Sequence, residues 1–374
     1  MTTKGPWDVL IIGGGLAGLT CALQLSKAGV QVLVIEKQPY PHHRVCGEYV
    51  SNEVLPHLNS LGIDPFAAGA KPITRFEMST KKGALLSTEL PLGGFGISRY
   101  AFDNLLYEAV KNKADILFET VESVTFSNEM FSVSTLNRNT YKAAYVVGAF
   151  GKRSQLDISL KRSFIQQKSP WLGVKMHYQA EFPDDLVALH NFEGGYCGLS
   201  KTETDVVNAC YLTTYASFKH HGNIAAFQQN VLAKNPHLAA FFSDAIPVFE
   251  KPLTISQISF EQKKPVADHI FMIGDSAGLI HPLCGNGMAM AIHGAKLFSE
   301  RYLAAGQQGG IHREQLEMDY TRAWKTTFEK RLRTGRRIQS ALLHPIAAKV
   351  GLGLVKSMPS ILPHIIKKTH GTLV

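Results

Sequence analysis

The amino-terminal segment alternates unbroken apolar runs with a stretch of helical spacing. Residues 7–12 (WDVLII) form an apolar run of strand length, and residues 30–36 (VQVLVIE) form a second one. Runs of this kind are typical of parallel strands that are covered on both faces. The stretch between them, LTCALQLSKAG, has helical spacing and ends at Gly29, where a C-terminal glycine is expected. The pattern therefore predicts a right-handed βαβ unit.

The rest of the chain shows two kinds of pattern. Residues 102–114 are amphipathic, and residues 114–136 alternate as two strands around a turn. The apolar runs at 141–149 and 269–275 return to the buried-strand type. Together with the first unit, these segments predict a doubly wound α/β domain in which the strands near both ends of the chain share one sheet.

Residues 166–264 follow a different pattern, with several β-type stretches around one helical stretch near 224–233. We therefore expect an α/β protein in which a Rossmann-like domain carries a second, antiparallel-sheet substrate domain and a C-terminal helical tail. The predicted boundaries are 1–75, 96–160 and 265–330 for the first domain, 76–95 and 161–264 for the substrate domain, and 331–374 for the tail.

A glycine motif follows the first apolar run directly. Gly13, Gly15 and Gly18 form GxGxxG before the helix, and Glu36 ends the second strand. In this context Gly13 permits a tight turn, Gly15 lets backbone amides approach a pyrophosphate, and Gly18 allows close helix–strand packing. Glu36 can accept hydrogen bonds from ribose hydroxyls and would repel a 2′-phosphate. The motif favours FAD or NAD over NADP, the alternative being a purely structural turn.

A second glycine-bearing segment, IFMIGDSAGLIHPLCGNGMAMAIHGA, occupies residues 270–295. With the first motif, it resembles the FAD-dependent oxidoreductases of the p-hydroxybenzoate hydroxylase fold, and within them the geranylgeranyl reductase family. The resemblance implies FAD as the cofactor, an FAD-binding domain of the GR2 type, and a ribityl contact from Asp275, which follows Gly274. It also implies a loop beneath the isoalloxazine ring, formed by Pro282, Gly285 and Gly287.

The electron donor is less clearly indicated. Residues 98–106 (SRYAFDNLL) resemble the family's R-x-x-[FL]-[DE]-x-x-L segment, which would place Arg99 near the FAD. Phe150 stands where many flavin hydroxylases of this fold have the aspartate of an Asp-Gly pair, and it cannot orient a polar cofactor group. We see no second nucleotide-binding βαβ unit in the sequence. NAD(P)H is therefore expected as a transient electron donor, with a ferredoxin or a quinone as the alternative.

The segment HRVCGEYVS, residues 43–51, resembles the Cys-Gly-Glu run of geranylgeranyl reductases. The resemblance implies that Arg44 contacts the FAD and that Cys46 faces the substrate cavity. Glu48 lies two residues from Cys46 and disfavours a thiolate, so covalent catalysis is not expected. Cys46 is either a small wall residue or a proton donor to the substrate.

Two further residues are candidates for proton transfer. GGYCGLSKTE (194–203) keeps the Tyr196 of the family's Y-x-W-x-F-P segment but has Gly198 and Leu199 where bulk is expected. Tyr196 either donates a proton or packs in a sheet, and His281 either lies near the flavin or caps the loop. The W-x-W-x-I-P segment of flavin halogenases is absent from the sequence, so halogenation is not expected.

Metal sites and disulfides are not indicated. The cysteines lack CxxC spacing, and adjacent histidines such as His42 and His43 point to opposite sides of an extended strand. The positions of the five cysteines are Cys21, Cys46, Cys197, Cys210 and Cys284.

The positive charge of the chain is concentrated in the tail. The net charge is +9, and residues 322–374 contain eleven Lys or Arg and one acidic residue, Glu329, which leaves the rest near −1. A nucleic-acid partner is therefore not expected. The tail is amphipathic as well as basic, so it either contacts an anionic membrane surface or docks on the core.

These patterns predict an enzyme, a flavoprotein in the cytoplasm, since no secretory signal and no run of 18 apolar residues is present. Peripheral contact with the inner membrane face would be through the tail. The best prediction is a reductase that transfers hydride from reduced flavin to a carbon–carbon double bond of a lipophilic, isoprenoid or polyketide-like substrate. The alternatives are a monooxygenase that hydroxylates an aromatic or polyketide-like substrate, and a non-catalytic FAD-binding redox sensor.

Overall fold

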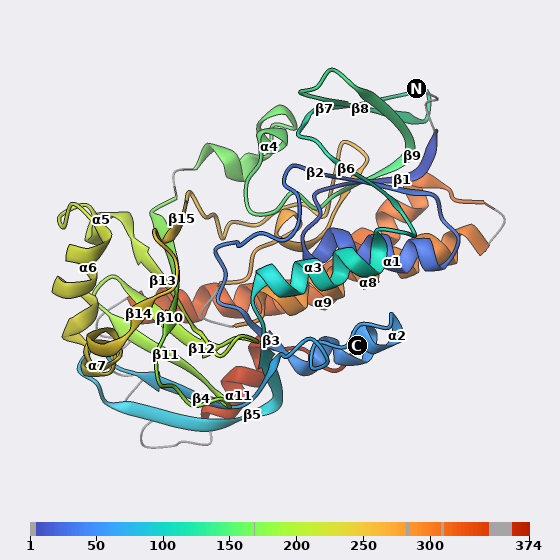
Figure 1. Cartoon of the computed structure of the whole chain (residues 1–374). Helices are drawn as coiled ribbons and strands as arrows, with labels where there is room; N and C mark the ends of the chain where they lie inside the picture. The colour runs from blue at the N-terminus through green and yellow to red at the C-terminus, as the bar shows by residue number, and fades with distance from the viewer. Residues whose placement is uncertain (1–4, 168, 282–284, 308–309, 344–360) are drawn as a thin grey trace.

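The computed structural model describes residues 5–167, 169–281, 285–307, 310–343 and 361–374, which form two sheets joined side by side (Figure 1). The first sheet confirms the predicted doubly wound α/β domain, because its central strands are parallel and run in the order β6-β2-β1-β9-β17. These strands are β1 (Trp7–Ile12), β2 (Val32–Glu36), β6 (Asp115–Phe118), β9 (Thr140–Gly148) and β17 (Ile270–Met272). β16 (Val266–Ala267) is antiparallel to β17, and β7 (Val121–Ser127) and β8 (Met130–Thr135) form a meander onto β9.

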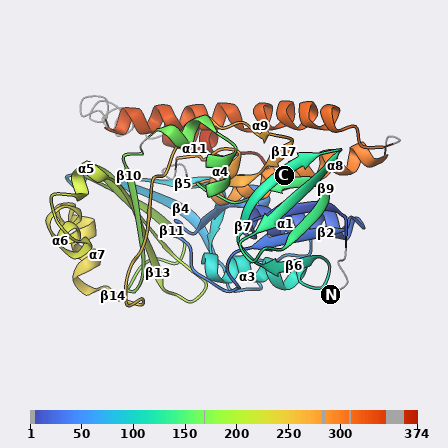
Figure 2. The same cartoon turned by 90° about the horizontal axis from the view of Figure 1, so that it is seen from above.

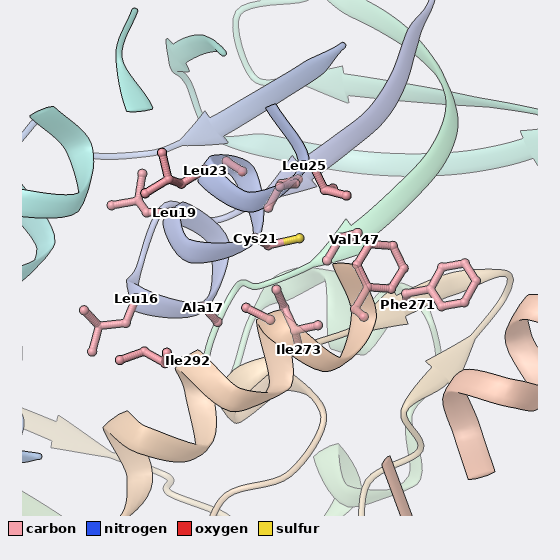
Figure 3. Close-up of a cluster of buried hydrophobic side chains, with 14 of the residues drawn as sticks. Leu16, Ala17, Leu19, Cys21, Leu23, Leu25, Val147, Phe271, Ile273 and Ile292 are labelled. Atoms are coloured by element: carbon pink, nitrogen blue, oxygen red, sulfur yellow. The ribbon is translucent and has the colours of Figure 1, made fainter. Parts of the chain in front are cut away.

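The first sheet is covered by three helices, α1 (Leu16–Lys27), α3 (Arg99–Val110) and α8 (Gly287–Gln307). α1 is buried along nearly its whole length and packs against α8. Figure 3 shows Ala17 of α1 beside Ile292 of α8, and Cys21 of α1 beside Val147 of β9. The helix that begins at the glycine motif is therefore held in the centre of the core, which fixes the position of its N-terminus.

The second sheet forms most of the other half of the molecule, with strand order β14-β10-β13-β12-β11-β4-β5-β3 and β15 beside β10. Most neighbouring strands are antiparallel, as predicted, but β11 and β4 are parallel. The bounds are β3 (Tyr49–Ser51), β4 (Lys71–Ser79), β5 (Leu85–Gly96), β10 (Trp171–Gln179), β11 (Leu186–Phe192), β12 (Gly195–Lys201), β13 (Val207–Thr214), β14 (Ile246–Pro247) and β15 (Leu253–Ser256).

One face of this second sheet is covered by the helices α5 (Tyr215–Phe218), α6 (Ile224–Asn230) and α7 (Pro236–Asp244), which lie at its outer side in Figure 1. The opposite face is turned toward the first domain. The sheet also includes β3 and all of β4, so the predicted boundary at residue 75/76 cuts through a continuous strand. The remaining short helical segments are η1 (Asn52–Val54), α2 (Leu55–Ser60), α4 (Gln155–Ser159), η2 (Ser163–Gln166), η3 (Leu232–Lys234) and η4 (Gly274–Ser276).

The described parts of the tail, up to residue 343 and from residue 361, are largely helical and dock on both halves. α9 (Arg313–Leu343) runs along one side of the whole molecule, and α11 (Ile361–Thr369) lies between α9 and β5 (Figure 2). The predicted boundary at residue 330/331 falls inside α9, because its apolar face continues into the core of the first domain. Within the described residues, no helix is both long and apolar enough to cross a membrane.

Candidate FAD and substrate site

A large cavity of about 1360 Å³ lies between the two sheets. Its lining begins at the glycine motif, passes the segment 43–49 and the inner face of the second sheet, and ends at α11. A pocket for one drug-sized ligand is typically about 300 to 1,000 Å³, so this cavity is large enough for a dinucleotide and a second molecule beside it.

The glycine motif forms one end of the cavity. Gly13 has a φ of +105°, and a Cβ at this position would lie 2.4 Å from the carbonyl oxygen of Ala149. A Cβ at Gly18 would lie 1.9 Å from the carbonyl oxygen of Gly13. The amide of Gly14 donates to Glu36 Oε2 at 2.7 Å, so the second strand holds the turn in place. The turn and the N-terminus of α1 therefore have the geometry that the motif predicts.

Two arginines face this turn. A Cβ at Gly15 would lie 3.3 Å from Arg99 Nη2, so the Arg99 guanidinium stands opposite the turn. Asp103 is fully buried and binds both cations: Arg99 Nη2 lies 2.7 Å from Asp103 Oδ2, and Arg44 Nε lies 3.1 Å from the same oxygen. Arg44 Nη2 lies 3.3 Å from Glu36 Oε2 but makes no hydrogen bond within the described part of the chain. This buried donor beside the glycine turn suits a phosphate oxygen.

Asp103 was not among the residues predicted from the sequence. The signal for it was present, because Arg99 and Asp103 are four residues apart on an amphipathic helix and therefore share one face. It joins the predicted Arg44 and Arg99 beside the glycine turn, where its carboxylate holds both guanidinium groups.

The segment after β17 reaches the cavity from the opposite side. Asp275 lines the cavity, and its carbonyl oxygen accepts a hydrogen bond from Lys263 Nζ at 2.7 Å. Arg162 Nη2 donates to the carbonyl oxygen of Ser276 at 2.8 Å. Burial lowers the pKa of Lys263 to about 8. These two buried cations, which were not predicted from the sequence, hold the backbone at Asp275 and Ser276 against the cavity.

The loop expected beneath the isoalloxazine ring is described in part. Gly285 and Gly287 line the cavity, and α8 begins at Gly287, so its positive end points into the cavity as expected. Pro282 lies outside the described residues. A Cβ at Gly285 would lie 3.1 Å from the Tyr49 ring, which leaves little space for any larger residue.

The inner face of the second sheet supports the Cys-Gly-Glu segment. Lys175 Nζ on β10 donates to the carbonyl oxygen of Arg44 at 3.1 Å, and Asn208 Nδ2 on β13 donates to that of Cys46 at 3.1 Å. Cys46 is half-buried and lines the cavity. The segment therefore forms the junction between the predicted cofactor end and the substrate end of the cavity.

Glu48 is the centre of a buried charged cluster. Its carboxylate pairs with Lys175, accepts a hydrogen bond from the Arg99 amide at 2.7 Å, and lies 2.6 Å from His177 Nε2. Glu48 and Lys175 have no exposed surface. Burial alone would raise the pKa of Glu48, but Lys175 and His177 more than offset burial and hold this pKa below its usual value. From the sequence, Glu48 was considered only as a neighbour of Cys46, and its partner Lys175, which is 127 residues away in the chain, was not predicted.

The same cluster includes potential metal ligands. One ligand atom each of His43, Glu48 and His177 lies within 4.8 Å of the others. This group could not be predicted from the sequence, because His177 lies 129 residues from Glu48. Because Lys175 already neutralises Glu48 and His177 is hydrogen-bonded to it, the arrangement is explained by ion pairing across the domain interface.

The predicted proton donors occupy different environments. Cys46 and Tyr196 both line the cavity. His281 is buried beside the rings of Trp171, Tyr196 and Phe260, and burial lowers its pKa to about 3. A histidine with this pKa is neutral at physiological pH and is therefore a poor proton donor to a substrate. Cys46 and Tyr196 stay as the candidates.

The far end of the cavity is apolar. Its wall includes side chains from the second sheet and from the tail, namely Phe76, Met78, Leu90, Leu189, Leu212, Leu362, Ile365 and Ile366. Gly198 also lines the cavity, and a Cβ at this position would meet no atom closer than 3.6 Å. The absence of a side chain at Gly198 therefore leaves space in the cavity. This end suits a lipophilic molecule.

A buried network joins the tail to this site. Glu53 Oε1 lies 3.0 Å from Arg331 Nη1 on α9, and Glu53 also accepts from the Gly371 amide and from Asn286 Nδ2 at 3.3 Å. Asn286 Nδ2 donates in addition to the carbonyl oxygen of Thr369 at 3.1 Å. Since Asn286 lies between Gly285 and Gly287, the expected flavin loop and the wall formed by α11 are held by the same groups.

The fold and this site define an FAD-dependent oxidoreductase, and the comparisons with known proteins agree. The chain belongs to the FAD binding domain family, whose sequence model matches residues 6–318. The glycine turn, the opposing arginines and the carboxylate of Asp275 fit FAD, and a bound FAD would supply the redox chemistry.

Relatives with different names match this chain. Conditioned medium factor receptor 1 of Dictyostelium discoideum is 21% identical over 86% of this chain and 68% of its own length. Digeranylgeranylglycerophospholipid reductase 1 of Methanothermobacter thermautotrophicus is 25% identical over 83% of this chain and 80% of its own. The FAD-dependent monooxygenase olcE of Penicillium canescens is 31% identical over 42% of this chain and 36% of its own. The resemblance to geranylgeranyl reductases is thus confirmed.

Among solved structures, the flavin-dependent brominase Bmp2 has a TM-score of 0.78 with this chain at 18% identity, covering 97% of this chain and 93% of that one. This similarity confirms the p-hydroxybenzoate hydroxylase fold. At such low identity it shows the fold alone.

Proposed function

We propose that this protein is a reductase that adds a hydride and a proton across a carbon–carbon double bond of a lipophilic, isoprenoid or polyketide-like substrate. The observation that carries the proposal is the continuous cavity, which leads from the glycine turn past Cys46 to an apolar end closed by α11. A relative named as a digeranylgeranylglycerophospholipid reductase, aligned over most of both chains, supports the same reaction class.

The residues of the chain have separate parts in this reaction. Arg44, Arg99 and Asp103 hold the phosphate end, and the Gly274–Asp275 turn holds the ribityl end of the cofactor. The apolar wall binds the hydrocarbon and excludes water. The proton that completes the reduction comes from the thiol of Cys46, the hydroxyl of Tyr196 or a water molecule, because both side chains line the cavity.

The proposed electron donor is NAD(P)H, which visits transiently. Phe150 lines the cavity behind the glycine turn, and its backbone Cα would lie 3.1 Å from a Cβ at Gly13. This position offers an aromatic ring where a polar contact to the nicotinamide cofactor would otherwise be available. We therefore expect NAD(P)H to bind weakly, so that the rate of flavin reduction saturates only at a high concentration of NAD(P)H.

A second candidate is a monooxygenase that hydroxylates an aromatic or polyketide-like substrate. It is favoured by the local match to a relative named as an FAD-dependent monooxygenase, which is the highest identity among the relatives given above. That match covers less than half of this chain, and so it gives less support than the longer match to the reductase.

The two reactions are separated by the mass of the product. The FAD-loaded protein is reduced with dithionite without oxygen and mixed with a geranylgeranyl glycerolipid in detergent. A reductase reoxidises its flavin and yields a lipid that has gained hydrogen. A product that has gained an oxygen atom only after air is admitted would contradict the proposal and support the monooxygenase.

Gly198 gives a test of where the substrate lies. We expect Gly198→Trp to keep FAD but to lower kcat/KM for the lipid by roughly tenfold or more, because overpacking a filled site costs about 1 to 3 kcal/mol. Gly198→Ala is the matched control, since a single methyl group meets no atom closer than 3.6 Å. Equal activity of the tryptophan variant and the control would show that the substrate does not reach the part of the cavity beside Gly198.

A further inference from the structure

The solvent-facing side of α9 carries a row of cations. We define the α9 stripe as the exposed residues Arg322, Lys325, Lys330, Arg333 and Arg337. At 3.6 residues per turn these side chains occupy an arc of about 140°. The opposite face is buried through Trp324, Phe328 and Leu332, so α9 is a helix with one side in the core and a basic side in solvent.

The charge of the stripe is only partly compensated. Arg333 Nη2 lies 3.1 Å from Glu329 Oε1, and Arg322 Nη1 lies 3.9 Å from Asp319 Oδ1. Lys325, Lys330 and Arg337 form no ion pair with any residue that the structure describes. An exposed, uncompensated row of this kind attracts an anionic surface.

The stripe is continuous with the apolar end of the cavity. Ile338, in the last part of α9, lines the cavity, and so do Ile365 and Ile366 of α11. Lys367 and Lys368, the next two residues of α11, are exposed. The wall that encloses the apolar end therefore has hydrocarbon side chains on its inside and lysines on its outside.

We propose that the α9 stripe and α11 dock this protein on an anionic lipid bilayer, so that a lipid substrate enters the cavity from the membrane past α11. Cations spread over about four turns on one side of a helix suit an extended flat surface. The entry of a lipid substrate from the membrane rests on the proposed function, whereas the binding of the protein to vesicles can be tested without it.

The test measures sedimentation of the FAD-loaded protein with vesicles at low salt. One vesicle contains phosphatidylcholine alone, and in the other about one third of the lipid is phosphatidylserine. We expect binding to the anionic vesicles only, and binding that weakens as salt is added. Equal binding to both vesicles, or no binding to the anionic ones, overturns the proposal.

The stripe is tested by the triple variant Lys325→Glu, Lys330→Glu, Arg337→Glu. Each basic residue near an anionic surface contributes about 1 kcal/mol, so binding should weaken by at least about a hundredfold. The matched control is Lys82→Glu, Lys142→Glu, Lys219→Glu, which changes the net charge equally at exposed positions elsewhere. Equal weakening in both triple variants would mean that only total charge matters, and would overturn the proposal.

Two further readouts separate the possible explanations. Binding of the unaltered protein to polyglutamate but not to vesicles would identify the stripe as a protein-docking surface and overturn the bilayer proposal. Both triple variants should retain FAD and reduce a detergent-dispersed lipid at the unaltered rate, because the stripe lies outside the cavity. If no variant reduces the lipid, the proposed function fails while the vesicle result still stands.

Discussion

Gly15→Val should yield a folded protein that has lost its FAD. The side chain at this position points toward Arg99 Nη2, 3.3 Å away, and meets no backbone atom within 4 Å. Valine therefore fits the fold but fills the space between the turn and the guanidinium, where the pyrophosphate is expected. If two charge-assisted hydrogen bonds of about 1.5 to 3 kcal/mol each are lost, FAD affinity falls by roughly 10² to 10⁴. The measurement is fluorescence titration of the apo-protein with FAD.

Two other glycines serve as controls for this result. A Cβ at Gly18 would lie 1.9 Å from a backbone oxygen, so Gly18→Val should destabilise the fold itself. Gly306→Val meets nothing closer than 3.9 Å and should leave both FAD affinity and folding nearly unchanged. Normal FAD affinity in Gly15→Val would mean that the cofactor does not pass between the turn and Arg99.

Lys175→Met should lower the free energy of unfolding by about 3 to 5 kcal/mol, because it leaves Glu48 charged, fully buried and without its cation. The measurement is chemical denaturation at neutral pH. Lys201→Met is the matched control in the same sheet. Its partner Asp184 is 63% exposed, so the loss should be about 1 kcal/mol or less.

A double variant and the pH dependence identify the cause. Glu48→Gln with Lys175→Met should recover part of the loss, since a neutral amide can still accept from the Arg99 amide. In the unaltered protein the pKa of Glu48 is lowered, so its contribution is present above the ordinary value of 4.5 and is lost as the pH falls below it. The deficit of Lys175→Met should therefore be largest at neutral pH and shrink in acid. A deficit that does not change with pH would point to lost packing instead.

The sequence was sufficient to predict the parts of the site that depend on local order. The glycine turn, Glu36 and the start of α8 follow from short motifs whose geometry is fixed by neighbouring residues. Asp103 could have been predicted in the same way, because helical spacing alone pairs it with Arg99.

The groups that were missed depend on pairing between distant strands. Lys175 meets Glu48 only because β10 and β13 place it on the inner face beneath the Cys-Gly-Glu segment. The docking of the tail depends on Glu53, a buried residue near the other end of the chain whose role no local pattern reveals. Periodicity predicts which face of an element is buried, but it does not predict which distant charge lies against it.

The contact between Glu53 and Gly371 spans 318 residues. Contacts of such separation are costly in chain entropy until the elements between them are in place, so we expect α11 to dock late in folding. Before that step the cavity lacks one wall, and afterwards Asn286 ties that wall to the loop at the start of α8. The apolar end of the cavity is therefore the last part of the site to be enclosed.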